Sequence, residues 1–248
     1  MWGSLFKMKT LFLLVLSSIL LLGDEASEII KKLDDNMRGS SIYLELTMRV
    51  VSHSHTREIR LENYAEGNEK SFVKITYPPR DKGITFLSLD NQMWQYVPKI
   101  ERVIKIPPSM MLQKWMGSDI SNDDIVKQSS LVKDYNPKVI AKNKNITTLE
   151  LTPKENAAVV WGKIELQVDT NTYTSQKDTY FDEDGKIVRY FIYKDVKKYG
   201  KYFIPMYWKI EPYEKKDQYT EIILNKVEYD IKISQEYFSK SALKRFSR

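Results

Sequence analysis

The most regular feature of the chain is an alternation of apolar and polar residues. Ile42, Leu44, Leu46, Met48 and Val50 fall on one side of an extended segment, and mostly polar residues fill the positions between them. Successive side chains of a strand point to opposite faces, so this pattern predicts a half-buried strand. Similar runs occur at Ile59–Leu61, Val73–Tyr77, Thr85–Leu89, Trp94–Val97, Ile164–Val168, Thr179–Phe181, Val188–Tyr193, Met206–Ile210 and Ile222–Ile231.

Short turn signals separate many of these runs. They are Gly67-Asn68, Asp90-Asn91, Asp184-Gly185 and Tyr199-Gly200. Many consecutive strands with tight turns predict an antiparallel meander, either a barrel or a strongly curved sheet. The alternation of strands and helices that a parallel α/β fold requires is missing. No interdomain linker is visible, so the body of the chain is predicted to be one domain.

Two regions depart from the strand pattern. Residues 26–38 place Ile29, Ile30, Leu33 and Met37 at helical spacing and end before Gly39, which predicts an amphipathic helix of about three turns. Later, Pro107-Pro108 leads into an apolar stretch that predicts a short helix ending near Gly117. Ser121 and Asp124 then have the spacing of a capping box at the start of a further short helix.

The first 23 residues have the plan of a secretory signal peptide. Lys7 and Lys9 precede a short apolar run that ends at Gly23. The run is shorter than the roughly 20 residues of a stable membrane span, although an uncleaved anchor is the alternative. Residues 1–23 are therefore predicted to be a signal peptide and 24–248 the exported domain. The chain has no cysteine, which excludes disulfides, thiolate metal sites and lipidation of its own amino terminus.

The net charge and the small number of candidate catalytic residues both limit the classes of function that the chain can have. The net charge is +6 and is spread along the chain; a basic surface suits anionic headgroups, and export argues against nucleic acid as a partner. The two histidines, His53 and His55, are expected at a hairpin turn rather than at a metal or catalytic site. Asp182–Gly185 is interpreted as a hairpin turn rather than a calcium loop, and Asp119, Asp123 and Asp124 as helix caps. These observations predict no enzymatic activity, no catalytic residues, no metal and no cofactor; the weakest alternative is a lipid-directed enzyme that depends on His53 or His55.

The methionine-rich stretch is the strongest candidate for function. Met110, Met111, Trp115 and Met116 combine flexible, polarizable side chains with a large aromatic surface. Methionine-rich surfaces adapt to varied apolar ligands. The residues alone favour a plug that forms part of the core, and the alternative is a movable apolar lid over a curved sheet.

Several motifs resemble the outer membrane lipoprotein-sorting protein family, which belongs to the LolA/LolB-like superfamily. The most specific is Met116-Gly117-Ser118-Asp119-Ile120 at its distance after Trp94-Gln95-Tyr96-Val97-Pro98. The resemblance covers nearly all of residues 24–248. The other matching residues are Lys82–Leu87, Met93, Asp123–Ile125, Ile204-Pro205, Trp208, Tyr219–Glu221, Phe238 and Leu243.

This resemblance implies a mainly β fold, an open (half) antiparallel β-barrel with short lid helices and an N-terminal helix. It implies a periplasmic carrier or chaperone that binds acyl chains of lipoproteins or lipids in an apolar cavity and moves them between the inner and outer membranes. Implied partners are an inner-membrane exporter of the RND or ABC type and an outer-membrane acceptor; the alternative is an accessory subunit of an RND-type lipid exporter that acts through protein contacts. The residues expected to bind lipid are Phe86, Leu87, Met93, Trp94, Met110, Met111, Leu112, Trp115 and Met116.

Overall fold

The computed structural model describes residues 25–126, 131–157, 159–215 and 217–248. The predicted signal peptide, residues 1–23, lies outside the described residues. Within them, thirteen strands form a single antiparallel sheet in the order β6-β5-β4-β3-β2-β1-β13-β12-β11-β10-β9-β8-β7. The strands are β1 (Ser41–Val51), β2 (Thr56–Glu66), β3 (Lys70–Tyr77), β4 (Thr85–Leu89), β5 (Gln92–Val97), β6 (Arg102–Ile106), β7 (Tyr135–Asn143), β8 (Ile146–Pro153), β9 (Lys163–Asp169), β10 (Thr174–Phe181), β11 (Ile187–Tyr199), β12 (Tyr202–Pro212) and β13 (Tyr219–Tyr229).

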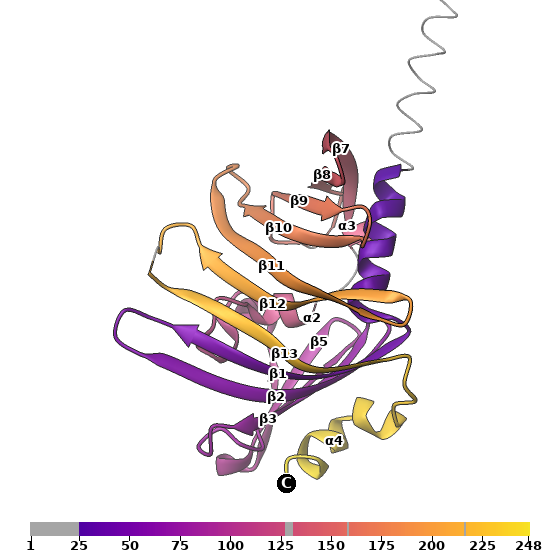
Figure 1. Ribbon diagram of the computed structural model, residues 1–248. Helices are drawn as coiled ribbons and strands as arrows, with labels where there is room; N and C mark the ends of the chain where they lie inside the picture. The colour runs from indigo at the N-terminus through magenta and orange to yellow at the C-terminus, as the bar shows by residue number, and fades with distance from the viewer. Residues whose placement is uncertain (1–24, 127–130, 158, 216) are drawn as a thin grey trace, which may run out of the picture.

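The order of the strands explains why a segment crosses the open side of the sheet. The chain enters at the centre with β1, moves outward to the edge strand β6, and resumes at the opposite edge with β7. It then returns strand by strand until β13 pairs with β1. The connection from β6 to β7 has to travel from one edge to the other. Figure 1 shows the long central strands curving, with α2 (Asn122–Val126) of this connection on their concave side.

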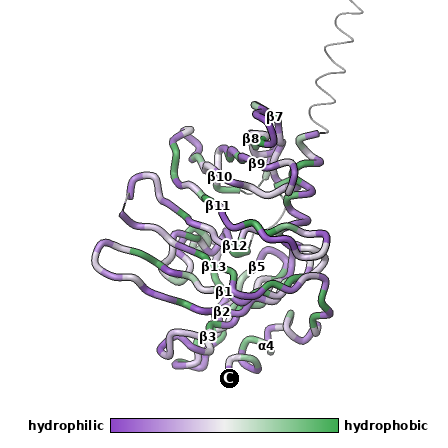
Figure 2. The backbone as a smooth tube through the Cα atoms, in the orientation of Figure 1, coloured by the Kyte–Doolittle hydropathy of each residue, from purple (hydrophilic) through white to green (hydrophobic). Residues whose placement is uncertain are grey.

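The predicted curved antiparallel sheet is confirmed, and in the described residues it is open, with β6 and β7 as its edges. Figure 2 shows hydrophobic and hydrophilic positions interspersed along the strands. Most observed strands extend beyond the predicted runs: β2 spans Thr56–Glu66, for example, where only Ile59–Leu61 was expected. Strands β6, β7 and β8 were not predicted.

The predicted N-terminal helix is confirmed over residues 25–38. Ile29, Ile30 and Leu33 are buried against β8 and β9, in a cluster that includes Leu149, Leu151, Ile164 and Leu166. Gly39 ends the helix with a positive φ of 60°, and its amide donates a hydrogen bond to the Asp35 carbonyl. The helix therefore covers the part of the sheet near β7.

The chain ends on the convex side of the sheet. A 3₁₀ turn, η4 (Gln235–Phe238), leads into α4 (Lys240–Arg245), which is capped by Ser239. Leu243 and Ala242 pack against the outward side chains of β3, β4 and β5, in a cluster with Phe72, Leu87, Trp94 and Tyr96. Both faces of this part of the sheet are therefore buried.

The methionine-rich stretch differs from the predicted helix. It forms two 3₁₀ turns, η2 (Pro108–Met110) and η3 (Trp115–Gly117), and Met116 and Gly117 both have positive φ. The chain reverses here because the Trp115 amide donates to the Ile120 carbonyl across an isolated bridge between Lys114 and Ser121. The following helix, α2, is present as predicted, and a short α3 (Leu131–Asp134) precedes β7.

Candidate functional site

A cavity of about 290 Å³ lies between the concave face of the sheet and the crossing connection. We call residues 107–126 of that connection the lid. The cavity joins two parts of the core, one near β1, β2 and β13 and one near the N-terminal helix, β9 and β10. The apolar lining includes Leu33, Met37, Ile42, Leu44, Leu46, Met48, Leu61, Ala65, Val73, Trp115, Ile120, Ile125, Val126, Tyr135, Trp161, Ile164, Tyr180, Phe191, Tyr193, Trp208 and Ile222.

The size of the cavity suits a hydrocarbon chain. A cavity of roughly 150 Å³ in another protein holds one benzene molecule, so 290 Å³ corresponds to about a dozen carbon atoms. This is close to the lower end of the range of about 300–1,000 Å³ found for small-molecule pockets. The lining also includes Gly67, Asn68 and Glu69 of the exposed turn between β2 and β3, so the cavity opens to the surface there.

The lid closes the cavity with Trp115. Its indole is 3% exposed and packs against Phe86 of β4, with the ring centroids 5.3 Å apart. Ile120, Ile125 and Val126 extend the same apolar surface and also line the cavity. The inner side of the lid is thus continuous with the core of the sheet.

Ser118 holds the turn that presents Trp115. Its hydroxyl donates to the Trp115 carbonyl at 2.7 Å and accepts from the Ile120 amide at 3.2 Å, and the side chain is fully buried. The left-handed conformation at Gly117, φ 72°, favours glycine at this point of the turn. The Met-Gly-Ser-Asp-Ile motif therefore serves to form the lid.

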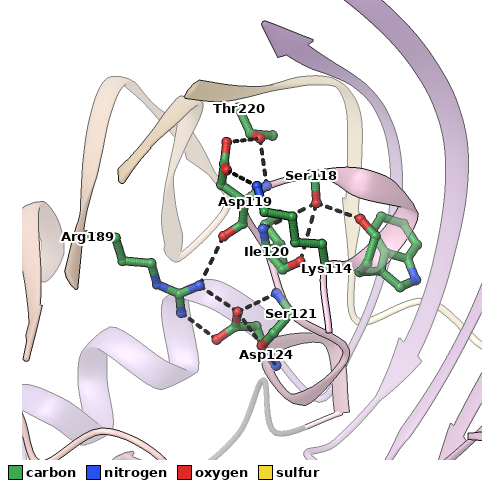
Figure 3. Close-up of polar contacts among 9 residues, drawn as sticks. Lys114, Ser118, Asp119, Ile120, Ser121, Asp124, Arg189 and Thr220 are labelled. Carbon is green, nitrogen blue, oxygen red and sulfur yellow. Dashed lines mark hydrogen bonds and ion pairs between the residues drawn. The ribbon is translucent and has the colours of Figure 1, made fainter. Parts of the chain in front are cut away.

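A buried ion pair joins the lid to the sheet (Figure 3). Arg189 of β11 donates from Nη1 to Asp124 Oδ2 at 2.8 Å and from Nη2 to Asp124 Oδ1 at 2.6 Å. Nη1 also donates to the Asp119 carbonyl at 3.1 Å. Burial alone would raise the pKa of Asp124, but Arg189 and the hydrogen bonds of Ser121 hold it below its ordinary value. The pair is charged and bidentate, a geometry that fixes the position of α2.

A second contact anchors the lid to β13. The Asp119 amide donates to Thr220 Oγ1 at 2.9 Å, and Thr220 Oγ1 donates to Asp119 Oδ2 at 2.9 Å. Lys114, itself in the lid, pairs with Asp119 Oδ1 at 2.7 Å. We call Asp119, Asp124, Arg189 and Thr220 the latch. Because β11 and β13 both contribute to it, the latch fastens the lid across the centre of the concave face.

The capping box predicted from Ser121 and Asp124 is confirmed. Asp124 Oδ2 accepts from the Ser121 amide at 2.7 Å, and the Asp124 amide donates to Ser121 Oγ at 3.1 Å. The interpretation of Asp124 as a cap was incomplete, because the same carboxylate also binds Arg189.

One acidic group lies on the β10 side of the cavity. Asp178 lines it, is only 5% exposed and accepts a hydrogen bond from Tyr193 at 2.7 Å. Burial raises the pKa of Asp178 to about 6, and the hydroxyls of Ser175 and Tyr193 offset part of this rise. The cavity is therefore apolar over most of its wall, with a polar group at this point.

The nine residues predicted to bind lipid lie in several different places in the structure. Phe86, Met93 and Trp115 belong to the inner core, and Met110, Met111 and Met116 pack partly buried against it. Of these nine residues, Trp115 is the one that lines the cavity. Leu112 is 63% exposed.

The other two predicted residues, Leu87 and Trp94, need correction. They lie on the convex face under α4, so their expected place in the cavity was wrong. The reason is the alternation itself: Phe86 and Leu87 are neighbours in one strand and must face opposite sides.

The most polar members of the site were missed. Arg189 lies two residues before Phe191 in its strand, and Asp178 lies two residues before Tyr180. Phe191 and Tyr180 are apolar and face inward, so Arg189 and Asp178 lie on the inward face as well. A charged residue on the apolar side of a predicted strand is unusual, since such residues are rarely buried unless they are paired. That signal could have identified Arg189, which lies within the predicted run Val188–Tyr193, although not its partner; Asp178 lies one residue before the predicted run Thr179–Phe181.

The histidines lie away from the cavity, at the turn between β1 and β2. His55 Nδ1 contacts the hydroxyls of Ser52 and Ser54, and His53 approaches Asp217 at 3.9 Å. Among the described residues no group of three histidine, aspartate or glutamate side chains is close enough together to hold a metal ion. In the same residues there is no helix whose length and apolar character would let it span a membrane.

Solved structures share this architecture. A DUF1329 family protein from Desulfovibrio piger superposes with a TM-score of 0.82 at 21% identity, over 90% of this chain and 99% of that one. A putative outer membrane lipoprotein-sorting protein domain from Vibrio parahaemolyticus has a TM-score of 0.78 at 18% identity, over 90% and 100%. A LolA superfamily protein from Nitrosomonas europaea has a TM-score of 0.73 at 18% identity, over 88% and 98%.

The protein therefore has the LolA-like fold, an open antiparallel sheet with a lid, and the resemblance inferred from the motifs is confirmed at the level of fold. No curated protein matches the chain in sequence. The sequence model of a family described as "Uncharacterized protein" matches residues 67–245, well over half of the chain, and the chain belongs to that family.

Proposed function

We propose that the protein is a periplasmic carrier that binds acyl chains of lipoproteins or lipids in this cavity and moves them between the inner and outer membranes. The observation that carries the proposal is an apolar cavity of chain-like size closed by a lid that polar contacts hold in place. Burial of each methylene is worth about 0.8 kcal/mol, so about twelve carbons gain on the order of 10 kcal/mol. A chain that leaves a membrane needs such a surface around it.

The latch supplies a means of release. Its polar contacts can exchange with water when the lid lifts, whereas the apolar contacts of Trp115 are replaced by those of the ligand. A partner that binds the open lid better than the closed one would shift the population toward opening. An inner-membrane exporter of the RND or ABC type and an outer-membrane acceptor are the partners that this role requires.

Native mass spectrometry of the protein released from the periplasm without detergent tests the proposal. Ala65 lines the cavity from β2, and Ala65→Phe would fill part of it. We expect lipid adducts on the wild type, few on Ala65→Phe, and unchanged adducts on Ala141→Phe, which places the same ring on the exposed surface of edge strand β7. Equal adducts on all three proteins, or none on the folded wild type, would contradict a carrier that uses this cavity.

A second candidate is an accessory subunit that docks on an RND-type lipid exporter. The observation in its favour is edge strand β6, where Val103 is 45% and Ile104 39% exposed beside Arg102 and Lys105. An edge strand has free backbone groups that can pair with another chain. Crosslinking from Val103 to an exporter, together with a wild type that has no lipid adducts, would favour this role over the carrier.

A further inference from the structure

Edge strand β6 combines exposed apolar side chains with unpaired cations. Val103 is 45% exposed and Ile104 39%, and Ile100, in the turn before the strand, is 55% exposed. Arg102 and Lys105 stand on either side of this apolar pair, are exposed, and make no ion pair within the described residues. Single exposed apolar residues are normal on a protein surface, whereas a contiguous group marks an interaction site.

Helix α4 brings further cations to the convex side of this edge. Lys105 Nζ lies 5.8 Å from the centroid of the Trp94 ring, and Lys240 Nζ lies 4.7 Å from the same centroid. Lys244, four residues after Lys240, is exposed on the same side of α4. Two ammonium groups beside one ring repel each other, and a negatively charged partner would relieve that repulsion.

The register of β6 shows which way its side chains project. Val103 pairs with Tyr96 of β5, and Lys105 pairs with Trp94. Tyr96 and Trp94 belong to the convex cluster, so Val103 and Lys105 project from the convex face beside α4. The alternate residues project from the other side of the same strand, and Lys99 and Ile100 lie in the turn that leads into it.

We call this group of apolar and cationic side chains the β6 edge surface. Residues 99–105 contribute three cations and one carboxylate, Glu101, and α4 adds two lysines, so the surface is positively charged. The β6 edge surface consists of Lys99, Ile100, Arg102, Val103, Ile104, Lys105, Lys240 and Lys244.

We propose that the β6 edge surface docks on an anionic lipid bilayer. Apolar side chains enter the boundary between headgroups and acyl chains, while lysine and arginine contact the lipid phosphates. Lysine suits this position because its stem packs on apolar groups and its ammonium group stays in the hydrated layer. A protein partner would have to pair each cation that it buries, whereas the phosphates of a bilayer remain mobile and hydrated.

Docking at β6 brings the start of the lid to the bilayer. The lid begins at Pro107, directly after Ile106, the last residue of β6. For a carrier of acyl chains, this places the exchange of the ligand at the membrane surface. That consequence rests on the proposed function, but the docking itself needs no ligand in the cavity and is measured separately from lipid adducts.

Sedimentation of the wild type with vesicles tests the docking. We expect binding to vesicles of phosphatidylglycerol and phosphatidylethanolamine, and little binding to vesicles of phosphatidylcholine. Binding should weaken as salt rises, because the screening length falls from about 10 Å at 0.1 M to about 3 Å at 1 M. No binding to the anionic vesicles would overturn the proposal and leave β6 to a protein partner. The carrier function would then still stand or fall on its lipid adducts.

Charge variants assign the binding to this surface. Each cation near an anionic surface strengthens binding by about fivefold, so Lys105→Gln combined with Lys240→Gln should weaken it by about 25-fold. Lys197→Gln combined with Lys198→Gln removes the same charge from exposed positions of β11 and should leave binding nearly unchanged. Equal losses in the two double variants would show a diffuse attraction of a basic protein and overturn the assigned surface.

An apolar variant tests whether β6 enters the bilayer. Val103→Ser should weaken binding by about fourfold, the effect of one buried methylene, and the loss should persist at high salt. Val188→Ser makes the same change at a position of β11 that is 37% exposed, and it should bind like the wild type. Wild-type binding by Val103→Ser would overturn insertion of the strand.

Discussion

Arg189 and Asp124 are 65 residues apart in the sequence, yet the Arg189 guanidinium donates hydrogen bonds to both carboxylate oxygens of Asp124, at 2.8 and 2.6 Å. Arg189 is 5% exposed and also lies over the ring of Trp161, 4.4 Å from its centroid. Cation–π contacts and a bidentate ion pair together satisfy most of a buried charge. The ion pair thus connects the lid to the packed core of the sheet.

Asp124→Asn is expected to loosen the lid. The amide can still accept hydrogen bonds from Ser121, but Arg189 is left as an uncompensated buried charge. Breaking a buried pair in this way costs about 3–5 kcal/mol, which chemical denaturation would measure. Hydrogen exchange should quicken most in residues 115–126. Lys186→Ala, which breaks an exposed pair with Asp184, should change stability by less than about 0.5 kcal/mol. Similar effects from the two variants would contradict a structural role for the latch.

Leu87→Ala is expected to weaken the fold without altering the cavity. Leu87 is fully buried under α4 on the convex face, so the truncation should cost about 2–5 kcal/mol of stability. Lipid bound per folded molecule should remain at the wild-type level, as judged by native mass spectrometry below the melting temperature. A loss of lipid from the folded variant would show that the convex face takes part in binding.

The sequence was sufficient to predict those elements whose signal is local. The two-residue alternation from Ile42 to Val50 corresponds to β1, and helical spacing with Gly39 at its end corresponds to residues 25–38. The spacing of Ser121 and Asp124 predicted a cap that the hydrogen bonds confirm. In each case the physical cause lies within a few residues of the pattern.

The placement of side chains on the two faces could not be predicted, because it depends on which segments cover the sheet. In β4, Phe86 and Leu87 are both buried, since α4 lies outside and the lid inside. Such a strand has no alternation from which to choose an inner face. Strand β7 was missed for the opposite reason, because most of its residues are exposed and its apolar residues Val139, Ile140 and Ala141 are consecutive rather than alternating with polar ones. The partner of Arg189 depends on the path between the two edges, which no local pattern encodes.

The stability of the wild type is expected to fall as pH rises from about 4 to 6, by an amount that depends on Asp178. Its folded-state pKa of about 6 lies above the ordinary value of 3.8, so the folded protein holds a proton that the unfolded chain has released. A pKa difference of one unit between the folded and unfolded states corresponds to about 1.4 kcal/mol. Above pH 6 the ionisation of Asp178 therefore lowers the free energy of unfolding by about 3 kcal/mol. Asp178→Asn should remove this loss and be more stable than the wild type at pH 7. Urea denaturation from pH 4 to 7 measures it, and parallel pH profiles for the two proteins would contradict a buried, titrating Asp178.

The opposite sign is expected for Asp124. Its pKa is lowered in the folded protein by Arg189, so the ion pair stabilises the fold at neutral pH and is lost as pH falls through the folded-state value. The protection factors of residues 115–126, corrected for the intrinsic pH dependence of amide exchange, should therefore fall in acid before the sheet unfolds. Protection of the lid that persists unchanged until global unfolding would show that the latch does not open by itself.

Tryptophan fluorescence should reveal which face of the sheet meets the ligand. Trp115 lines the cavity, whereas Trp94 lies on the convex face under α4, and both are buried. Bromine atoms quench tryptophan only at short range, so a brominated acyl chain should quench Trp115 and leave Trp94 unaffected. With Trp115→Phe the quenched fraction of the emission should fall, while with Trp94→Phe it should rise, because an unquenched component has been removed. A smaller quenched fraction in Trp94→Phe than in Trp115→Phe would place the chain against α4 and contradict binding beneath the lid.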